Sequence, residues 1–400
     1  MDQITPRPVS VNAATIRQLI DRIAEGAAER EFRRILPYDE IALIKQARLG
    51  ALRLPVSAGG GGASFRALYE TVLRLAAADA NVAHILRNHF VFVERFVQNP
   101  VTPRQHAWHK AVADGALFGL ANGELDAKTV GGTPLKVTLQ PDGDGFRITG
   151  NKFYSTGTLF SEYVLTRVST QDGRSASAII PTDRDGVTLV DDWDGVGQRL
   201  TGSGSTLFDN VRVEADEVVV DAPDTGYGIA YGSTLAQLYL TTVNAGILRN
   251  LLEDAKALVT GRKRNFYFAP DPVPSADPIL QQTIGEVSAY AHAAVVLVLA
   301  AADALDASDG SRDAAHYASN LAAKAKVVVD SLVLQAGSQL FDVGGASAAL
   351  RERNLDRHWR NARTLASHNP RSYKARALGQ WELHGTPLPA GGFFRQDPSL

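Results

Sequence analysis

The chain has 400 residues and a formal net charge of -2, with 41 basic and 43 acidic residues, so no strong field would gather nucleic acid or a membrane surface. The absence of cysteine excludes disulfides, thiolate nucleophiles and cysteine-ligated metals. The amino terminus lacks the order of a signal peptide, and no apolar run reaches the ~18 residues of a membrane span. These features predict a soluble, cytoplasmic protein.

Residues 1–117 are predicted to form an N-terminal α-helical domain. Apolar residues between Ile16 and Ala27 recur at spacings of three and four, which places them on one helical face. Three further helices follow, and Asp39, Ser64 and Asp79 are their expected N-caps. The last of them is expected to continue through the run NVAHILRNHFVFVERFV.

Residues 118–225 change to the alternating pattern of β-strands. Short β-branched segments are separated by turn signals such as DGDG and TDRDG, and this close spacing is typical of a compact barrel or sandwich. The predicted strands lie at 135–140, 145–156, 162–169, 175–181, 186–190 and 205–213.

Residues 226–400 return to helical spacing and predict a C-terminal bundle, which makes the fold class α+β. The apolar run 291–305 is too short for a membrane span and is expected to be a buried bundle helix. Four prolines in 266–278 forbid a helix interior there. That loop is either a lid over a site or a surface excursion.

The usual catalytic motifs do not occur. The sequence has no GxxxxGK[ST], no GxGxxG between a strand and a helix, and no GxSxG. The nine histidines form no HExxH and no pair four residues apart, so no metal site is predicted. A histidine could serve as a general acid or base, but spacing alone does not rank the nine.

Four segments, in order, resemble the acyl-CoA dehydrogenase fold. They are LPVSAGGGG (54–62), GNKFYST (150–156), WDGVGQRLTGSGSTLFDNVRV (193–213), and the Gly-Gly pair at 344–345 with Arg-Asn-Ala at 360–362. The resemblance covers nearly the whole chain. It implies an N-terminal helical domain, a central β barrel and a C-terminal four-helix bundle.

The carboxy-terminal run DRHWRNARTLASHNPRSYK resembles a more specific family, the dibenzothiophene monooxygenase group. Common dehydrogenases of the fold carry a glutamate base where this chain has Asn369, and an amide cannot abstract a proton. The resemblance implies a reduced-flavin (FMNH2)-dependent monooxygenase. An FAD-containing acyl-CoA dehydrogenase stays open as the alternative, because some dehydrogenases place their glutamate on another helix.

The resemblance also assigns residues. His89 and His368 resemble active-site histidines, and Asn122 and Thr156 resemble residues that orient the flavin and take part in catalysis. Retention of Asn122, Thr156 and His368 argues against an inactive scaffold. The predicted cofactor-binding residues are Asn122, Tyr154, Thr156, Trp193, Arg264, Phe266, Ser347 and Asn369.

Two positions depart from the family pattern. Leu365 replaces a histidine, and Ser347 stands where an arginine is expected, which weakens the case for a phosphate clamp from a neighbouring subunit. Both departures bear on substrate identity more than on reaction type.

By resemblance, a separate NAD(P)H-dependent reductase supplies reduced FMN, with FAD as the alternative flavin. Molecular oxygen adds at C4a to give a (hydro)peroxyflavin, and the histidines hydrogen-bond its distal oxygen and shuttle a proton. The expected substrate is a small organosulfur or heteroaromatic molecule, and the expected assembly is a homotetramer.

Overall fold

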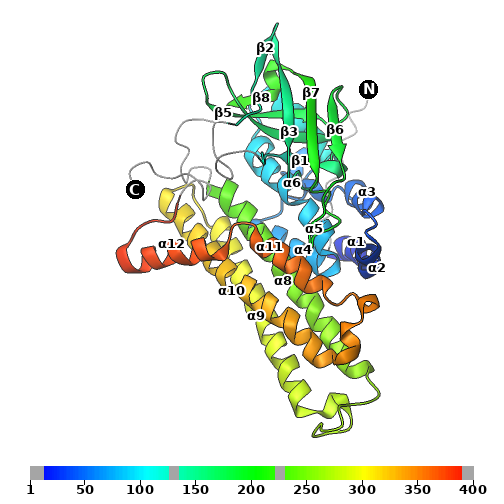
Figure 1. Cartoon of the computed structure of the whole chain (residues 1–400). Coiled ribbons are helices and arrows are strands. Elements are labelled where there is room, and N and C mark those ends of the chain that lie inside the picture. Colours follow the sequence, from blue (N-terminus) through cyan, green and yellow to red (C-terminus); the bar gives the residue numbers. More distant parts are fainter. Residues whose placement is uncertain (1–12, 126–134, 221–229, 390–400) are drawn as a thin grey trace.

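The computed structural model describes residues 13–125, 135–220 and 230–389. The chain forms a group of short helices, then eight strands, then long helices, and Figure 1 shows the strands gathered at one end of the molecule. The helix–strand–helix order predicted from the sequence is confirmed.

Two of the three predicted N-caps in the first segment are confirmed. Ser64 Oγ accepts from the Ala67 amide at 3.1 Å, and Asp79 accepts from two amides of the next helix. Asp39 is not a cap, because the helix begins one residue earlier, at Tyr38. The helices are α1 (Ala13–Ala24), α2 (Ala27–Arg33), α3 (Tyr38–Gln46), α4 (Phe65–Ala78), α5 (Ala80–Ile85), α6 (Arg87–Phe92) and α7 (Pro103–Ala113).

The single helix predicted after Asp79 is divided. α5 ends at Ile85, α6 begins at Arg87, and a π-helical turn follows over Val93–Val97. The break separates two histidines that one continuous helix would have carried. It allows His84 and His89 to face different parts of the molecule.

The strands form two four-stranded sheets, with orders β1-β4-β5-β8 and β2-β3-β7-β6. All pairs are antiparallel except β1 with β4. Two isolated bridges, Gly123 with Phe153 and Thr138 with Ser169, link the sheets. The arrangement therefore lies between an open sandwich and a closed barrel. The strands are β1 (Phe118–Ala121), β2 (Gln140–Asp142), β3 (Gly145–Lys152), β4 (Tyr163–Ser169), β5 (Ser175–Pro181), β6 (Val187–Val190), β7 (Ser205–Val213) and β8 (Val218–Val220).

The two sheets share a core of aliphatic side chains. Val164, Val168 and Ile180 of the first sheet pack with Ile148 and Val211 of the second, all fully buried. Burial of such side chains stabilises by about 1.5–3 kcal/mol each. Most predicted strands are confirmed, but in 135–140 only Gln140 belongs to a strand, while β1 and β8 come from residues outside the six predicted segments.

The long helices do not form a bundle by themselves. α8 and α9 pack against α4 of the first segment, and α8 and α10 pack against α11. One hydrophobic core contains residues of both helical segments, so the two segments fold around a common interior. The helices are α8 (Ala230–Gly261), α9 (Pro278–Asp306), α10 (Arg312–Gly344), α11 (Arg357–Ser367) and α12 (Arg371–His384).

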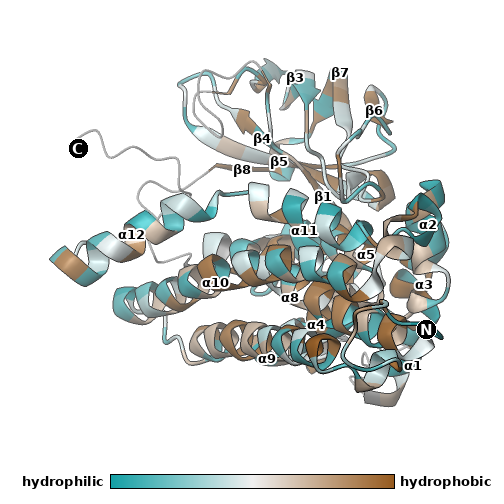
Figure 2. Cartoon of the chain, turned by 60° about the horizontal axis from the view of Figure 1, so that its bottom comes forward, coloured by the Kyte–Doolittle hydropathy of each residue, from teal (hydrophilic) through white to brown (hydrophobic). Residues whose placement is uncertain are grey.

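Helix α9 is less buried than its sequence suggested. By length and composition it could cross a membrane, yet only 28% of its most apolar window is buried in the chain. Ala294 and Val298 face the core, whereas Val296 is 50% exposed. Figure 2 shows the apolar colouring of α9 at the edge of the helical layer. The prediction of a buried bundle helix over 291–305 is therefore wrong for one face of α9.

The junction between sheets and helices positions the candidate site. Figure 2 shows α11 and α5 directly beneath the sheets, whereas the loop between α8 and α9 lies at the opposite end of the molecule in Figure 1. The proline-rich segment 266–278 belongs to that remote loop and contains one 3-10 turn, Pro274–Ala276. Within one chain it is not a lid over this junction.

Candidate functional site

The loop 191–204, between β6 and β7, attaches the sheets to the helices. The Gln198 amide donates to Asn361 Oδ1 on α11 at 2.6 Å, and the Leu200 amide donates to Asn81 Oδ1 on α5 at 3.2 Å. At Gly197 a Cβ would lie 2.1 Å from a backbone oxygen of α11, so only glycine permits this approach. The loop is therefore held from two sides, which fixes the side chain of Gln198.

Thr156 ends a chain of hydroxyl groups beside this loop. Its Oγ1 lies 2.6 Å from Ser203 Oγ, which lies 2.7 Å from Thr201 Oγ1, and Thr201 donates to the Gln198 carbonyl at 2.8 Å. A carbonyl only accepts, so the Thr201 hydrogen is committed and Ser203 donates to Thr201. Thr156 then donates to Ser203, and its remaining capacity toward a ligand is that of an acceptor.

His84 on α5 faces the same loop. Its Nδ1 lies 3.0 Å from Gln198 Oε1, and burial, followed by the charge of Arg87, lowers the pKa of His84 to about 3. The imidazole is therefore neutral near pH 7. The side-chain nitrogen Nε2 of Gln198 is buried and has no partner among the described residues. A buried donor of this kind is expected to serve a ligand.

His368 follows the last residue of α11 and is more than one third exposed. Burial, and then the charges of Arg87, His84 and Lys326, lower its pKa well below the ordinary value. His84 and His368 are thus in electrostatic contact at the junction, and Asn369 beside them has a left-handed backbone with φ of 57°.

His89 does not belong to this group. Its Nε2 contacts the Gly50 carbonyl at 3.0 Å, and its Nδ1 accepts from the Phe118 amide at 3.1 Å. The side chain is 1% exposed, and burial lowers its pKa to about 4. Because both ring nitrogens are occupied by backbone groups, this geometry does not support the expected proton shuttle. His89 instead joins α6 to β1 and to the turn at Gly50.

Two predicted cofactor-binding aromatic residues, Tyr154 and Trp193, lie together at this loop. The rings of Tyr154 and Trp193 meet edge to face, 6.1 Å apart, and Tyr154 is 60% exposed. The indole Nε1 of Trp193 donates to the Gln198 carbonyl at 2.9 Å. Asn122 is exposed just after β1.

Arg264, Phe266 and Ser347 lie elsewhere. The site lies beside the part of α8 that contains Tyr239, because the Tyr239 hydroxyl donates to the carbonyl of Ala83, the residue before His84 on α5. Arg264 follows the end of α8 at Gly261, about 33 Å further along at 1.5 Å per residue. Phe266 is in the same remote loop. Ser347 is in the turn after α10, where Gly345 lies close to the guanidinium of Arg262. Within one chain, a single flavin therefore cannot contact both the junction residues and the group of Arg264, Phe266 and Ser347.

Residues that the sequence did not single out complete the arrangement: His84, Arg87, Gln198 and Ser203. His84 and Arg87 lie in the run NVAHILRNHFVFVERFV, and Gln198 and Ser203 lie in the segment 193–213 that carried the resemblance. What was missing was the break at Leu86, which decides which histidine of HILRNHF faces the loop.

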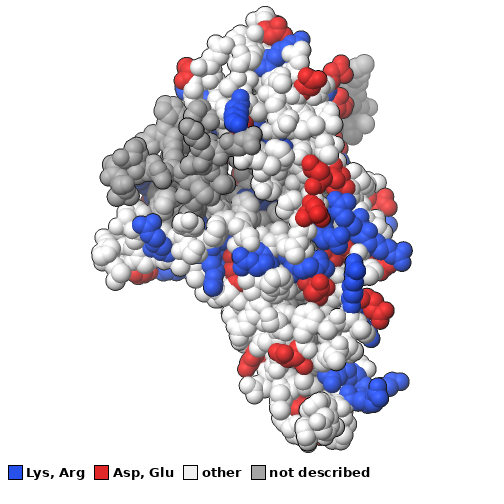
Figure 3. Space-filling model, viewed as in Figure 1, with Lys and Arg blue, Asp and Glu red and all other residues white. Residues whose placement is uncertain are grey.

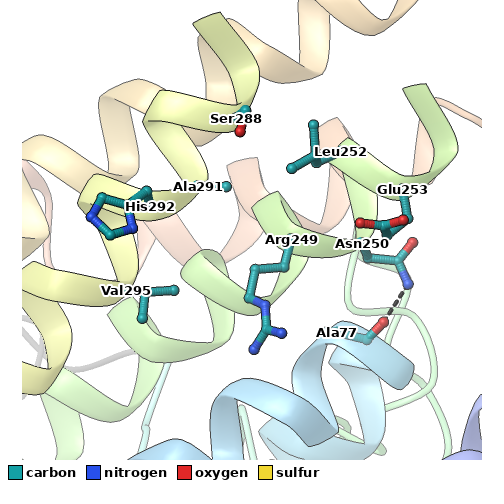
Figure 4. A pocket seen from close by; sticks show the side chains of 9 residues that line it. All are labelled: Ala77, Arg249, Asn250, Leu252, Glu253, Ser288, Ala291, His292 and Val295. Atoms are coloured by element: carbon teal, nitrogen blue, oxygen red, sulfur yellow. Dashed lines mark hydrogen bonds between the residues drawn. The ribbon is translucent and has the colours of Figure 1, made fainter. Parts of the chain in front are cut away.

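A separate pocket of about 390 Å³ lies between α8, α9 and the end of α4. Figure 4 shows Arg249 and Glu253 of α8 opposite Ser288 and His292 of α9, with Asn250 donating to the Ala77 carbonyl. None of the predicted site residues lines it. It is an open surface feature and is distinct from the junction.

The fold and the junction together define a class. Residues 238–372 match the family described as acyl-CoA dehydrogenase, C-terminal domain. The chain is 30% identical over 401 residues to the probable FMNH2-dependent monooxygenase SfnC of Pseudomonas putida, covering 97% of this chain and 98% of SfnC. The protein is therefore a member of the flavoenzyme class built on the acyl-CoA dehydrogenase fold.

Two solved structures agree with this assignment. FMN-bound TdsC from Paenibacillus sp. A11-2, a dibenzothiophene monooxygenase, has a TM-score of 0.87 and 28% identity, covering 95% of this chain and 99% of TdsC. Methanesulfinate monooxygenase MsuC from Pseudomonas fluorescens has a TM-score of 0.87 and 29% identity, covering 96% of this chain and 99% of MsuC. Within the class, the chain belongs to the family of FMNH2-dependent monooxygenases that includes SfnC.

Proposed function

We propose that this protein is an FMNH2-dependent monooxygenase that oxygenates a small organosulfur or heteroaromatic substrate. The relatives support this class, because their names include dibenzothiophene and methanesulfinate monooxygenases. A separate NAD(P)H-dependent reductase would supply the reduced FMN, and the enzyme would act in the cytoplasm. Bound FMNH2 supplies two electrons, so that one atom of O2 enters the substrate and the other leaves as water.

The orientation of the hydroxyl chain is the observation that carries the proposal. Thr156 can only accept from a ligand, because its own hydrogen is committed through Ser203 and Thr201 to a carbonyl. Reduced flavin carries a hydrogen on N5, whereas oxidised flavin does not. Thr156 therefore suits the reduced form. The free amide nitrogen of Gln198 is a donor for a flavin or substrate oxygen nearby.

The two histidines suit oxygen chemistry better than acyl dehydrogenation. Both have lowered pKa values, so they are neutral near pH 7 and can donate or accept hydrogen bonds without adding charge. Dehydrogenation requires a strong base beside the acyl chain, and Asn369 is not one. The nearby carboxylate of Asp330 is paired with Lys326, so it is not available as that base.

The remote residues imply an assembled enzyme. Arg264, Phe266 and Ser347 would contact the flavin of a neighbouring chain in a homotetramer, since they lie too far from their own Thr156. The exposed apolar face of α9 is available for such contacts. Figure 3 shows basic side chains in a band across the middle of the molecule and again near its lower tip.

The test is oxygen transfer with a reductase and FMN. The purified protein should form a sulfur- or carbon-oxygenated product in proportion to FMNH2 consumed, with FMNH2 preferred over FADH2. Thr156→Val, which keeps the shape and removes the acceptor, should weaken binding of reduced FMN more than that of oxidised FMN. Flavin reduction by an acyl-CoA, without oxygen transfer to any substrate, would instead identify the dehydrogenase.

A further inference from the structure

Arg87 is a cation at the junction without a carboxylate partner. Its Nε donates to the Ala236 carbonyl of α8 at 3.0 Å, and no described residue accepts from its two terminal nitrogens. Its side chain is half-buried, and burial lowers its pKa to about 10. Removing a guanidinium from water without a counter-ion is costly, so its retention here calls for a negatively charged ligand.

The side chain of Arg87 points away from the hydroxyl chain of Thr156, Ser203 and Thr201. The next residue, Asn88, donates to the Thr156 carbonyl at 3.0 Å and so faces the sheets. Successive residues of a helix point about 100° apart, from its 3.6 residues per turn. Arg87 accordingly turns to α8, and its charge acts on His84 and His368 there.

Two further basic side chains, those of Lys374 and Lys326, lie near this turn of α8. Lys374 of α12 donates to Gln237 Oε1, one residue after the Arg87 contact, and burial lowers the pKa of Lys374 to about 6. Lys326 lowers the pKa values of both Lys374 and His368, and it is paired with Asp330 at 2.7 Å. Near pH 7 Lys374 is then largely neutral and Lys326 is paired with Asp330, so within this cluster the charge of Arg87 has no carboxylate partner among the described residues.

We propose that Arg87 binds an anionic oxygen group of the substrate, so that the natural substrate is a small organic oxyanion such as a sulfinate, sulfonate or carboxylate. The planar guanidinium offers two parallel donors, which match the paired oxygens of such groups. The proposal rests on the proposed function. It narrows the expected substrates from organosulfur and heteroaromatic compounds in general to those that carry a negative charge.

The test compares two probes of similar shape, methanesulfonate and uncharged dimethyl sulfone, by calorimetric titration of the FMN-loaded protein. We expect wild type to bind methanesulfonate at least tenfold more tightly. Arg87→Met should abolish this preference and Arg87→Lys should keep part of it. The FMN dissociation constant should stay within twofold in both. Arg22→Met, on the exposed face of α1, is the matched control.

Turnover supplies a second readout. The KM for methanesulfinate should rise at least tenfold in Arg87→Met, with a smaller change in kcat. Equal binding of both probes by wild type would overturn the proposal. So would a loss of FMN affinity in Arg87→Met that matches the loss of anion affinity, since Arg87 would then serve the flavin. Selective anion binding without oxygen transfer would refute the proposed function and leave the anion site standing.

Discussion

Replacing each histidine of HILRNHF by leucine should separate a structural residue from an active-site residue. In His89→Leu two buried backbone groups, the Gly50 carbonyl and the Phe118 amide, lose their partner. Each buried unsatisfied group costs about 1–3 kcal/mol, so we expect a loss of about 2–6 kcal/mol in the free energy of unfolding. His84→Leu leaves one buried group, Gln198 Oε1, without its partner and should cost about 1–3 kcal/mol.

The assay is urea unfolding at one fixed protein concentration, because assembly makes stability depend on concentration. Coupling is measured beside it, as moles of product per mole of FMNH2 consumed. We expect His84→Leu to fold well and lose coupling, and His89→Leu to be unstable but coupled in its folded fraction. If His89→Leu stays within 1 kcal/mol of wild type and loses coupling as His84→Leu does, the structural assignment of His89 is wrong.

Three other predictions follow from burial and packing. Burial lowers the pKa values of five described histidines, among them His84 to about 3 and His89 and His358 to about 4. Below pH 6.5 the unfolded chain binds protons that the folded chain does not, so stability should fall by up to about 1 kcal/mol per histidine from pH 7 to 5.5, measured by urea midpoints. Gly197→Ala should displace the loop 191–204 and so weaken FMN binding. Gly379→Ala, on α12 with nothing within 4 Å, should instead stabilise the protein by about 0.5–1 kcal/mol. Equal effects of the two substitutions would contradict the close packing of Gly197 against α11. Val296→Glu on α9 should lower the oligomeric mass in light scattering, and an unchanged mass would exclude that face as a contact.

Much of the fold follows from local pattern. Ser64 and Asp79 precede apolar helical runs, and each proves to cap the helix that follows it, because a short polar side chain satisfies the free amides there. The alternating segments between 145 and 213 become strands for the same local reason. Long-range packing was not predictable in this way. No local pattern shows that α4 completes the core of the long helices, or that one face of α9 stays exposed.

The candidate site divides along the same line. Thr156, Trp193 and His368 are found at the junction, because each sits in a segment whose pattern covers the whole loop or turn. The choice between His84 and His89 depended on a helix break at Leu86 that composition does not signal. The pairing of Gln198 with His84 joins residues 114 apart in sequence, and only the folded chain brings them together.

The length of α8 connects assembly with catalysis. The junction lies beside Tyr239 in the first third of α8, and the end of α8 at Gly261, about 33 Å further along, leads to Arg264. If these remote residues hold the flavin of a neighbouring chain, an isolated chain has the oxygen-facing half of a site and lacks the phosphate-facing half. Loss of the α9 contact should then weaken FMN binding even though no junction residue has changed. A monomeric Val296→Glu variant that binds FMN as tightly as wild type would show that each chain holds its flavin alone, and Arg264 would have no part in the site.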